Sequence, residues 1–200
     1  MMKDRVILHV DQNSFYASVE MLRYPELKTV PCAVAGDPVN RHGIVLAKNQ
    51  LAKKAGVRTG EAIWQAKQKC PGLILIPPDY RRYIHYSRLA RGMYYEYTDR
   101  VEPFGIDECW LDLTGSPSDD GAAVAEELRR RMKDELGLTV SVGVSWNKIY
   151  AKLGSDMRKP DAVTVITRSN YLDVVYPLPA EDLIYVGPAT TRQLCRIGVR

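Results

Sequence analysis

The stretch RVEPFGIDECWLDLTG, residues 100–115, is typical of a buried β-hairpin but carries two adjacent acids, Asp107 and Glu108. In a flat interior strand these two side chains would point to opposite faces, and one carboxylate would enter the core. Gly105, just before them, allows a tight turn, so both acids can converge near the hairpin tip. Converging carboxylates repel each other unless a cation lies between them. The stretch therefore predicts either a divalent-metal site or a solvated acidic turn.

The composition is that of an ordinary globular protein. The 200 residues are 46% hydrophobic and 26% charged, which suits one or two domains with a sizeable core. No apolar run approaches the ~20 residues of a membrane span, and the start MMKDRVILHVDQ reaches polar residues too early for a signal peptide. We therefore expect a cytoplasmic protein without a membrane partner. The net charge of +4 favours a nucleic-acid or nucleotide partner only weakly.

The four cysteines, Cys32, Cys70, Cys109 and Cys195, lie far apart in the sequence. They form no C-x-x-C pair and have no histidine pattern beside them, so neither zinc nor a disulfide framework is indicated. We expect buried free thiols.

Short apolar runs alternate with helical patterns along the chain. A nearly continuous apolar run at 5–11 predicts a central strand, and 13–25 follows with helical spacing up to Pro25. Further strands are expected at 31–36, 43–49, 73–77, 138–146 and 163–167, and helices at 50–56, 60–72, 79–98 and 119–137. The strict alternation in 138–146 indicates a half-buried strand. A hairpin followed by a helix and a returning strand predicts an α/β (α+β) fold of the ferredoxin-like group, with helices on one face.

Asp11 ends the first expected strand, where it can be grouped with the hairpin acids. If the two elements are neighbours in the sheet, Asp11, Asp107 and Glu108 meet at one edge. Three carboxylates there can hold two Mg²⁺ ions about 4 Å apart, an arrangement that stabilises both oxygens of a displacement at phosphorus. Spacing alone leaves open whether the strand and the hairpin are neighbours.

Four blocks of the chain resemble the Y-family translesion DNA polymerases, in the family's order and over essentially the whole length. The blocks are VDQNSFYASVE (10–20), FGIDECWLD (104–112), VGVSWNKIYAKLGSDMRKP (142–160) and VGPATTRQLCRIGV (186–199). The resemblance implies a right-hand polymerase that transfers deoxynucleotides from dNTPs to a primer 3′-hydroxyl by two-metal-ion catalysis. It implies a palm at 1–10 and 78–166, fingers at 11–77 and a partial thumb at 167–200 with a helix-hairpin-helix-like segment. The family's little finger is absent from this chain.

The resemblance also assigns roles to residues. Asp11, Asp107 and Glu108 match the family's catalytic carboxylates, and they would bind two Mg²⁺ ions, or Mn²⁺, with the carbonyl of Gln12. The residues implied to bind the nucleotide are Ser14, Phe15, Tyr16, Gln50, Lys53 and Lys159. Tyr16 would lie under the sugar and exclude a 2′-hydroxyl.

Several of these residues have simpler interpretations or depart from the family pattern. Phe15 is expected to be helix core, and Gln50 and Lys53 stand where the family usually has Tyr and Arg. Lys53 keeps the charge of an arginine but not its bidentate geometry. His9 is expected to be a core histidine with satisfied hydrogen bonds.

The implied DNA contacts are Lys148, Lys152 and Gly187. Lys148 and Lys152, four residues apart, would otherwise be a solvated helix stripe. At Gly187, the following Pro188 lacks the N–H that a phosphate-binding turn needs. The implied partners are primer-template DNA, a dNTP and a sliding clamp that would bind through residues outside this chain.

Two other classes of function stay open at this point. One is a catalytically weak or inactive DNA-binding accessory fragment, which the retained acids argue against. The other is a nucleotidyl cyclase, which also combines a palm-like sheet with metal-binding acids; the block at 186–199 argues against it.

Overall fold

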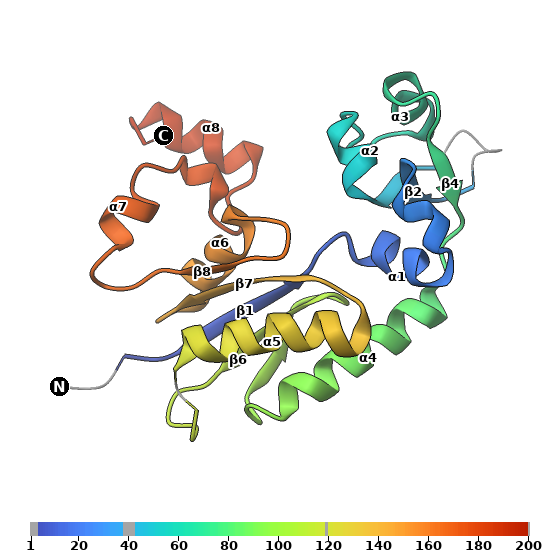
Figure 1. Ribbon diagram of the computed structural model, residues 1–200. Coiled ribbons are helices and arrows are strands. Elements are labelled where there is room, and N and C mark those ends of the chain that lie inside the picture. Colours follow the sequence, from blue (N-terminus) through green and yellow to red (C-terminus); the bar gives the residue numbers. More distant parts are fainter. Residues whose placement is uncertain (1–3, 38–42, 119, 200) are drawn as a thin grey trace. The chain divides into compact units, whose positions relative to one another are not determined.

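The computed structural model describes residues 4–37, 43–118 and 120–199 (Figure 1). The chain divides into two compact units. The first unit comprises Met1–Asp11, Ala90–Glu135 and Thr139–Arg200, and the second comprises Gln12–Leu89 and Leu136–Leu138. The long helix α4 (Tyr80–Tyr95), predicted at 79–98, contributes residues to both. Within the described ranges, no helix is long and apolar enough to cross a membrane.

The first unit is built on a five-stranded sheet in the order β5-β6-β1-β7-β8. Its strands are β1 (Ile7–Gln12), β5 (Val101–Pro103), β6 (Glu108–Asp112), β7 (Val140–Ser145) and β8 (Val163–Val165). Strand β6 pairs antiparallel with both β1 and β5, whereas β7 and β8 are parallel. The predicted hairpin is thus confirmed, and the question that the sequence left open, whether it neighbours the first strand, is answered by the pairing of β6 with β1.

Two helices cover opposite faces of this sheet. The first residue of α5 (Gly121–Leu136) lies against Val144, whereas Gly143 lies against the backbone of α6 (Lys148–Met157). Successive residues of a strand point to opposite faces, so α5 and α6 must lie on opposite sides of β7, as Figure 1 also shows. The expectation that the helices lie on one face is therefore wrong for α6.

Strand β7 is buried along its whole length, from Val140 to Ser145. The prediction of a half-buried strand was wrong because a helix covers each face: the polar Ser141 and Ser145 alternate with valines but are not exposed. Ser145 compensates for burial with a 3.0 Å hydrogen bond from its hydroxyl to the carbonyl of Ile166.

Gly143 sets the distance between α6 and the sheet. A Cβ atom there would lie 1.9 Å from the carbonyl oxygen of Ala151 and 2.5 Å from the amide of Ser155, both backbone atoms. We expect Gly143→Ala to lower the free energy of unfolding by about 1–3 kcal/mol, because α6 must move away from the sheet. Gly92→Ala is the control: nothing lies within 4 Å of its added Cβ, and alanine favours helix α4. Urea denaturation measures both, and equal stability of the two variants would contradict the close approach.

The remainder of the first unit contains α7 (Tyr171–Val175), a 3₁₀ turn (Ala180–Asp182) and α8 (Pro188–Arg196). Helix α8 has no buried residue, so Cys195 is exposed, contrary to prediction. Cys32, Cys70 and Cys109 are buried free thiols, as predicted.

The second unit contains a three-stranded sheet in the order β3-β2-β4. Its elements are α1 (Phe15–Arg23), a 3₁₀ turn (Pro25–Lys28), β2 (Cys32–Ala35), β3 (Val45–Lys48), α2 (Gln50–Lys54), α3 (Ile63–Lys69) and β4 (Ile74–Ile76). Buried Asn49 links them: its amide donates to the carbonyls of Leu27 and Val30, and its Oδ1 accepts from the amides of Cys32 and Ala52. The helices and strands lie within the predicted ranges, whereas the 3₁₀ turn at Pro25–Lys28 was not predicted.

Candidate functional site: a carboxylate and lysine cluster

The hairpin tip is a tight turn that depends on Gly105. This residue has a φ of +90°, a conformation that side chains disfavour. The amide of Phe104 donates to the carbonyl of Glu108 at 2.9 Å, and the guanidinium of Arg91 donates to the carbonyl of Gly105 at 2.7 Å. The turn thereby leaves Asp107 in the loop and Glu108 at the first position of β6.

The β1–β6 register brings the third acid to this tip. Asp11 lies directly opposite Glu108 in the antiparallel pair, so both side chains share one face of the sheet. The Asp11 side chain is 7% exposed and that of Glu108 is 20% exposed. The first strand and the hairpin are therefore neighbours, which the sequence spacing had left open.

Two lysines complete the cluster. Nζ of Lys152, on α6, lies 2.9 Å from Oε2 of Glu108 and 3.2 Å from Oδ2 of Asp11. Nζ of Lys159 lies 2.5 Å from Oδ2 of Asp11 and 2.8 Å from Oδ1 of Asp156. The cluster is therefore a network of alternating charge at the end of β1.

Burial and neighbouring charges shift the acids in different directions. Burial, with the charges of Asp11 and Glu108, raises the pKa of Asp107 to about 6. Burial also raises the pKa of Asp11, although Lys159 opposes it. Burial acts on Glu108 too, but contacts with His9 and Lys152 prevail and lower its pKa to about 2. Asp11 and Glu108 each have a lysine ammonium in direct contact, whereas the pKa of Asp107 is dominated by burial and by the two neighbouring acids.

The donor chemistry of the cluster suits a hard divalent cation. Mg²⁺ prefers carboxylate oxygens, and the β1–β6 register sets the carboxylates of Asp11 and Glu108 opposite each other. Across the described ranges, however, no three or more His, Cys, Asp and Glu side chains are already grouped to ligate a metal. The ammonium groups of Lys152 and Lys159 provide the countercharge instead.

His9 was expected to be a core histidine with satisfied hydrogen bonds, but it also reaches the cluster. It is fully buried; its Nδ1 lies 2.8 Å from Oγ of Ser155, and its Nε2 lies 3.2 Å from Oε2 of Glu108 without hydrogen-bond geometry. The sequence held one signal: His9 and Asp11 are two apart in a strand and so share a face.

The residues expected to bind the nucleotide belong to the second unit, apart from Lys159. Ser14 has φ +50° immediately before α1, and Phe15 is buried, as expected. The half-buried ring of Tyr16 stacks on Tyr83, with centroids 4.2 Å apart and 14° between planes. Tyr83 is fully buried, and its hydroxyl donates to Oε1 of Glu20 at 2.8 Å.

Gln50 and Lys53 both lie on the short helix α2. Gln50 is its first residue and is half-buried, whereas Lys53 is exposed. Asn49 caps this helix through its hydrogen bond with Ala52, which fixes the start of α2 against the unit's core.

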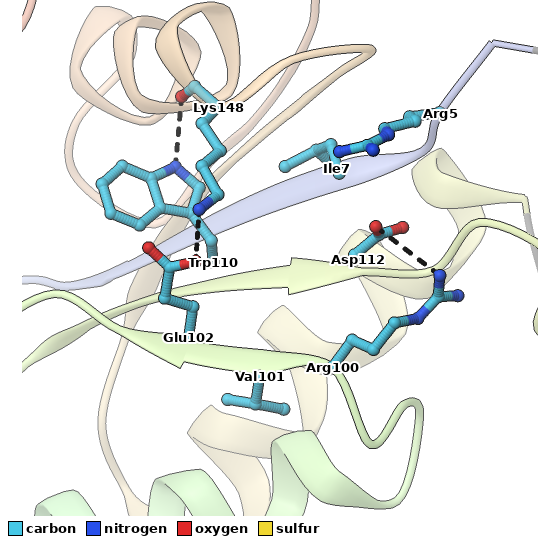
Figure 2. A pocket seen from close by; sticks show the side chains of 8 residues that line it. All are labelled: Arg5, Ile7, Arg100, Val101, Glu102, Trp110, Asp112 and Lys148. Carbon is cyan, nitrogen blue, oxygen red and sulfur yellow. Dashed lines mark hydrogen bonds and ion pairs between the residues drawn. The ribbon is translucent and has the colours of Figure 1, made fainter.

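The expected DNA-contacting residues occupy different environments. Lys152 belongs to the acid cluster, whereas Lys148 lines a separate hollow of about 340 Å³ in the first unit (Figure 2). Nζ of Lys148 pairs with Glu102 and lies 5.4 Å from the centre of the Trp110 ring. Gly187 precedes α8, and no described atom would contact a Cβ added there.

Comparisons with known proteins give a consistent match. The model of the impB/mucB/samB family matches residues 10–156. The chain is 56% identical over 197 residues to DNA polymerase IV of Acetivibrio thermocellus, covering 98% of this chain and 49% of that protein. It is 42% identical over 198 residues to DNA polymerase IV 1 of Bacillus subtilis, covering 98% and 48%. The chain thus spans about half the length of these curated relatives.

Solved structures match equally well. DinB from Sulfolobus solfataricus superposes with a TM-score of 0.89 at 29% identity, covering 98% of this chain and 58% of that one. An insertion ternary complex of Dbh DNA polymerase gives 0.90 at 29% identity, with the same coverage. The predicted α+β class is confirmed, and so is the resemblance to Y-family polymerases.

Proposed function

The chain belongs to the impB/mucB/samB family, and from this premise we propose that it is the catalytic region of a translesion DNA polymerase. It would transfer a deoxynucleotide from a dNTP to a primer 3′-hydroxyl, opposite a template base, and release pyrophosphate. The observation that carries the proposal is the register that sets Asp11 opposite Glu108, with Asp107 beside them at the hairpin tip. The matches to DNA polymerases over 98% of the chain argue against a nucleotidyl cyclase.

The proposed domains keep the predicted bounds: palm at 1–10 and 78–166, fingers at 11–77 and the start of a thumb at 167–200. The compact units divide the chain differently, because the first combines the proposed palm and thumb and the second includes part of α4. The second unit's sheet and short helices support the proposed fingers.

The catalytic acids would hold two Mg²⁺ ions, with Mn²⁺ as an alternative. Asp11, Asp107, Glu108 and the carbonyl of Gln12 are the proposed ligands. Bound metal would activate the primer hydroxyl and stabilise the charge of the leaving pyrophosphate. The carboxylates would keep that charge centred at the end of β1, while Lys159 would turn from Asp11 and Asp156 to the triphosphate.

The second unit would bind the rest of the nucleotide. The backbone amides of Ser14 and Phe15, at the start of α1, suit phosphate oxygens. Gln50 would contribute a hydrogen bond and Lys53 a charge, and Tyr16 would contact the sugar. Lys148, Lys152 and Gly187 are the proposed contacts to primer-template DNA. A sliding clamp as partner and a cytoplasmic location stay predictions.

A primer-extension assay tests the proposal. The chain, with Mg²⁺, a primed template and dNTPs, should extend the primer by the templated nucleotide. A folded protein that binds the primed template but adds no nucleotide would support the accessory-fragment alternative instead.

DNA binding by residues 1–200 is expected to be weaker than nanomolar at physiological salt and to fall steeply with salt concentration, because lysine–phosphate contacts dominate. Lys148→Ala should reduce the slope of log K against log salt by about one. Lys133→Ala is the control, since Lys133 lies on α5, on the other face of the sheet, and pairs with Asp161. Fluorescence anisotropy at several salt concentrations gives both slopes, and identical slopes would remove Lys148 from the interface.

A further inference from the structure

The proposed mechanism does not use a series of buried polar side chains next to Glu108, formed by His9 and Ser155. Ser155 and His9 are both fully buried, at 0% exposure, yet they lie next to the acid cluster. The ring of His9 is wedged by Trp110, with centroids 5.0 Å apart, and by Phe104, at 6.5 Å. Packing thus fixes the plane of the imidazole.

The two ring nitrogens face different partners. Nδ1 lies 2.8 Å from Oγ of Ser155, and Nε2 lies 3.2 Å from Oε2 of Glu108. Lys152 lies 2.9 Å from the same carboxylate oxygen. The imidazole of His9 and the ammonium of Lys152 thus both approach the same oxygen of Glu108 from the protein side.

The hydroxyl of Ser155 has a choice of acceptor that decides what His9 can do. It lies 2.7 Å from the carbonyl of Lys152 as well as 2.8 Å from Nδ1. When the hydroxyl donates to Nδ1, a neutral ring carries its proton on Nε2 and can donate to Glu108. When it donates to Lys152, the neutral ring presents a lone pair to the carboxylate, and the two repel.

The position of Ser155 follows from the close approach of α6. The amide of Ser155 lies so near Gly143 that a Cβ on that residue would be 2.5 Å away. The glycine in β7 therefore lets α6 come close enough for Ser155 to reach His9. Because Ser155 is fully buried, the serine, histidine and glutamate cannot act as a hydrolytic triad on a substrate.

We propose that His9 is a positioning residue, which fixes the Glu108 carboxylate through Nε2 while Ser155 fixes the imidazole through Nδ1. The inference rests on the proposed function, because it matters only if Glu108 binds the catalytic metal. Partners that orient a ligating carboxylate typically change metal affinity or activity about 10–100-fold when they are removed.

Two amide substitutions separate the roles of the two nitrogens. Gln at position 9 can place its side-chain amide near the Nε2 position, whereas Asn reaches only the Nδ1 position. We expect His9→Asn to raise the dissociation constant for Mn²⁺, measured by electron paramagnetic resonance of the unbound ion, by about tenfold. His9→Gln should stay within about threefold of the original protein. The concentration of Mg²⁺ that gives half-maximal single-turnover extension should follow the same order.

The outcomes separate this inference from the proposed function. An original protein that neither binds Mn²⁺ nor extends primers would overturn the proposed function. An active original protein whose folded His9→Asn variant keeps the same Mn²⁺ affinity would overturn only the role of His9. If His9→Asn does not fold, Ser155→Ala decides: an unchanged Mn²⁺ affinity in that variant overturns the inference, and a loss of about threefold or more supports it.

Discussion

Primer extension by the Glu108→Gln and Asp11→Asn proteins is expected to fall by roughly a thousandfold or more, which is about 4 kcal/mol in the activation barrier. The two residues are directly opposite in the β1–β6 register, so either amide removes half of the facing carboxylate pair. A neutral amide keeps the shape of the acid but not the charge that the proposed metals require. Single-nucleotide insertion under single-turnover conditions measures the loss.

Asp112→Asn is the matched control for that experiment. Asp112 lies on β6, on the same face as Glu108, but it pairs with Arg100 at 3.6 Å and has no contact with the cluster lysines in the described part of the chain. Its extension rate should stay within about threefold of the original, a change below 1 kcal/mol. If Glu108→Gln and Asp11→Asn both retained activity within about tenfold, the metal assignment would be wrong.

Replacement of Asp107 should change the stability of the protein as well as its activity. The pKa of Asp107 in the folded chain is about 6, against 3.8 for an ordinary aspartate. Ionised Asp107 therefore destabilises the native state above about pH 6, and this cost disappears as the pH falls below about 4. Without divalent metal at pH 7.5, Asp107→Asn should raise the melting temperature by about 2–4 °C.

Glu108→Gln should have the opposite effect on stability. The pKa of Glu108 is lowered to about 2 through His9 and Lys152, so its charge stabilises the native state at every pH above its ordinary pKa. Mutual repulsion alone would predict that the loss of any acid is stabilising. The contacts with His9 and Lys152 exclude Glu108 from that prediction, because they lower its pKa, whereas the pKa values of Asp107 and Asp11 are raised.

The hairpin acids could be predicted from the sequence because the signal was local. Gly105 before two acids in an apolar run indicates a tight tip, and its φ of +90° agrees. The strand ending in Asp11 was equally clear. Sequence spacing could not show that the strand and the hairpin are neighbours, because that depends on which strands pair. The register of β1 with β6 shows it.

The environment of the lysines and of His9 could not be predicted in the same way. Lys148 and Lys152 share a helix stripe, yet one pairs with Glu102 and the other with Glu108 and Asp11. That difference depends on where α6 crosses the sheet, which is set by the glycine contact in β7 rather than by any helix pattern. The roles of these residues in DNA binding stay predictions.

Tyr16→Ala is expected to raise insertion of a ribonucleotide relative to a deoxynucleotide by orders of magnitude. A ring packed under the sugar discriminates by collision with the 2′-hydroxyl, so its removal admits the hydroxyl without improving any other contact. The alternative is a tyrosine that only packs inside the second unit. The structure gives Tyr16 features of both, because its ring is half-buried yet stacked on Tyr83 at 4.2 Å.

One side of that ring is held rigidly, which favours a discriminating role. Tyr83 is fully buried and hydrogen-bonded to Glu20, itself 1% exposed, so the surface against which Tyr16 stacks cannot easily yield. A ring backed by a fixed neighbour resists displacement by a bulkier sugar better than a ring on a mobile loop. Tyr16→Phe keeps the ring and should therefore keep the sugar preference.

The measurement is insertion of GTP against dGTP opposite a template cytosine, with a melting curve for each variant. Loss of the stacked ring should cost about 1–3 kcal/mol of stability in Tyr16→Ala whichever role is correct, so stability alone does not decide. The ratio of the two insertion rates does. If Tyr16→Ala is folded, inserts dGTP and keeps the ratio of the original protein, Tyr16 does not contact the sugar, and its aromatic cluster serves only to pack α1 against α4.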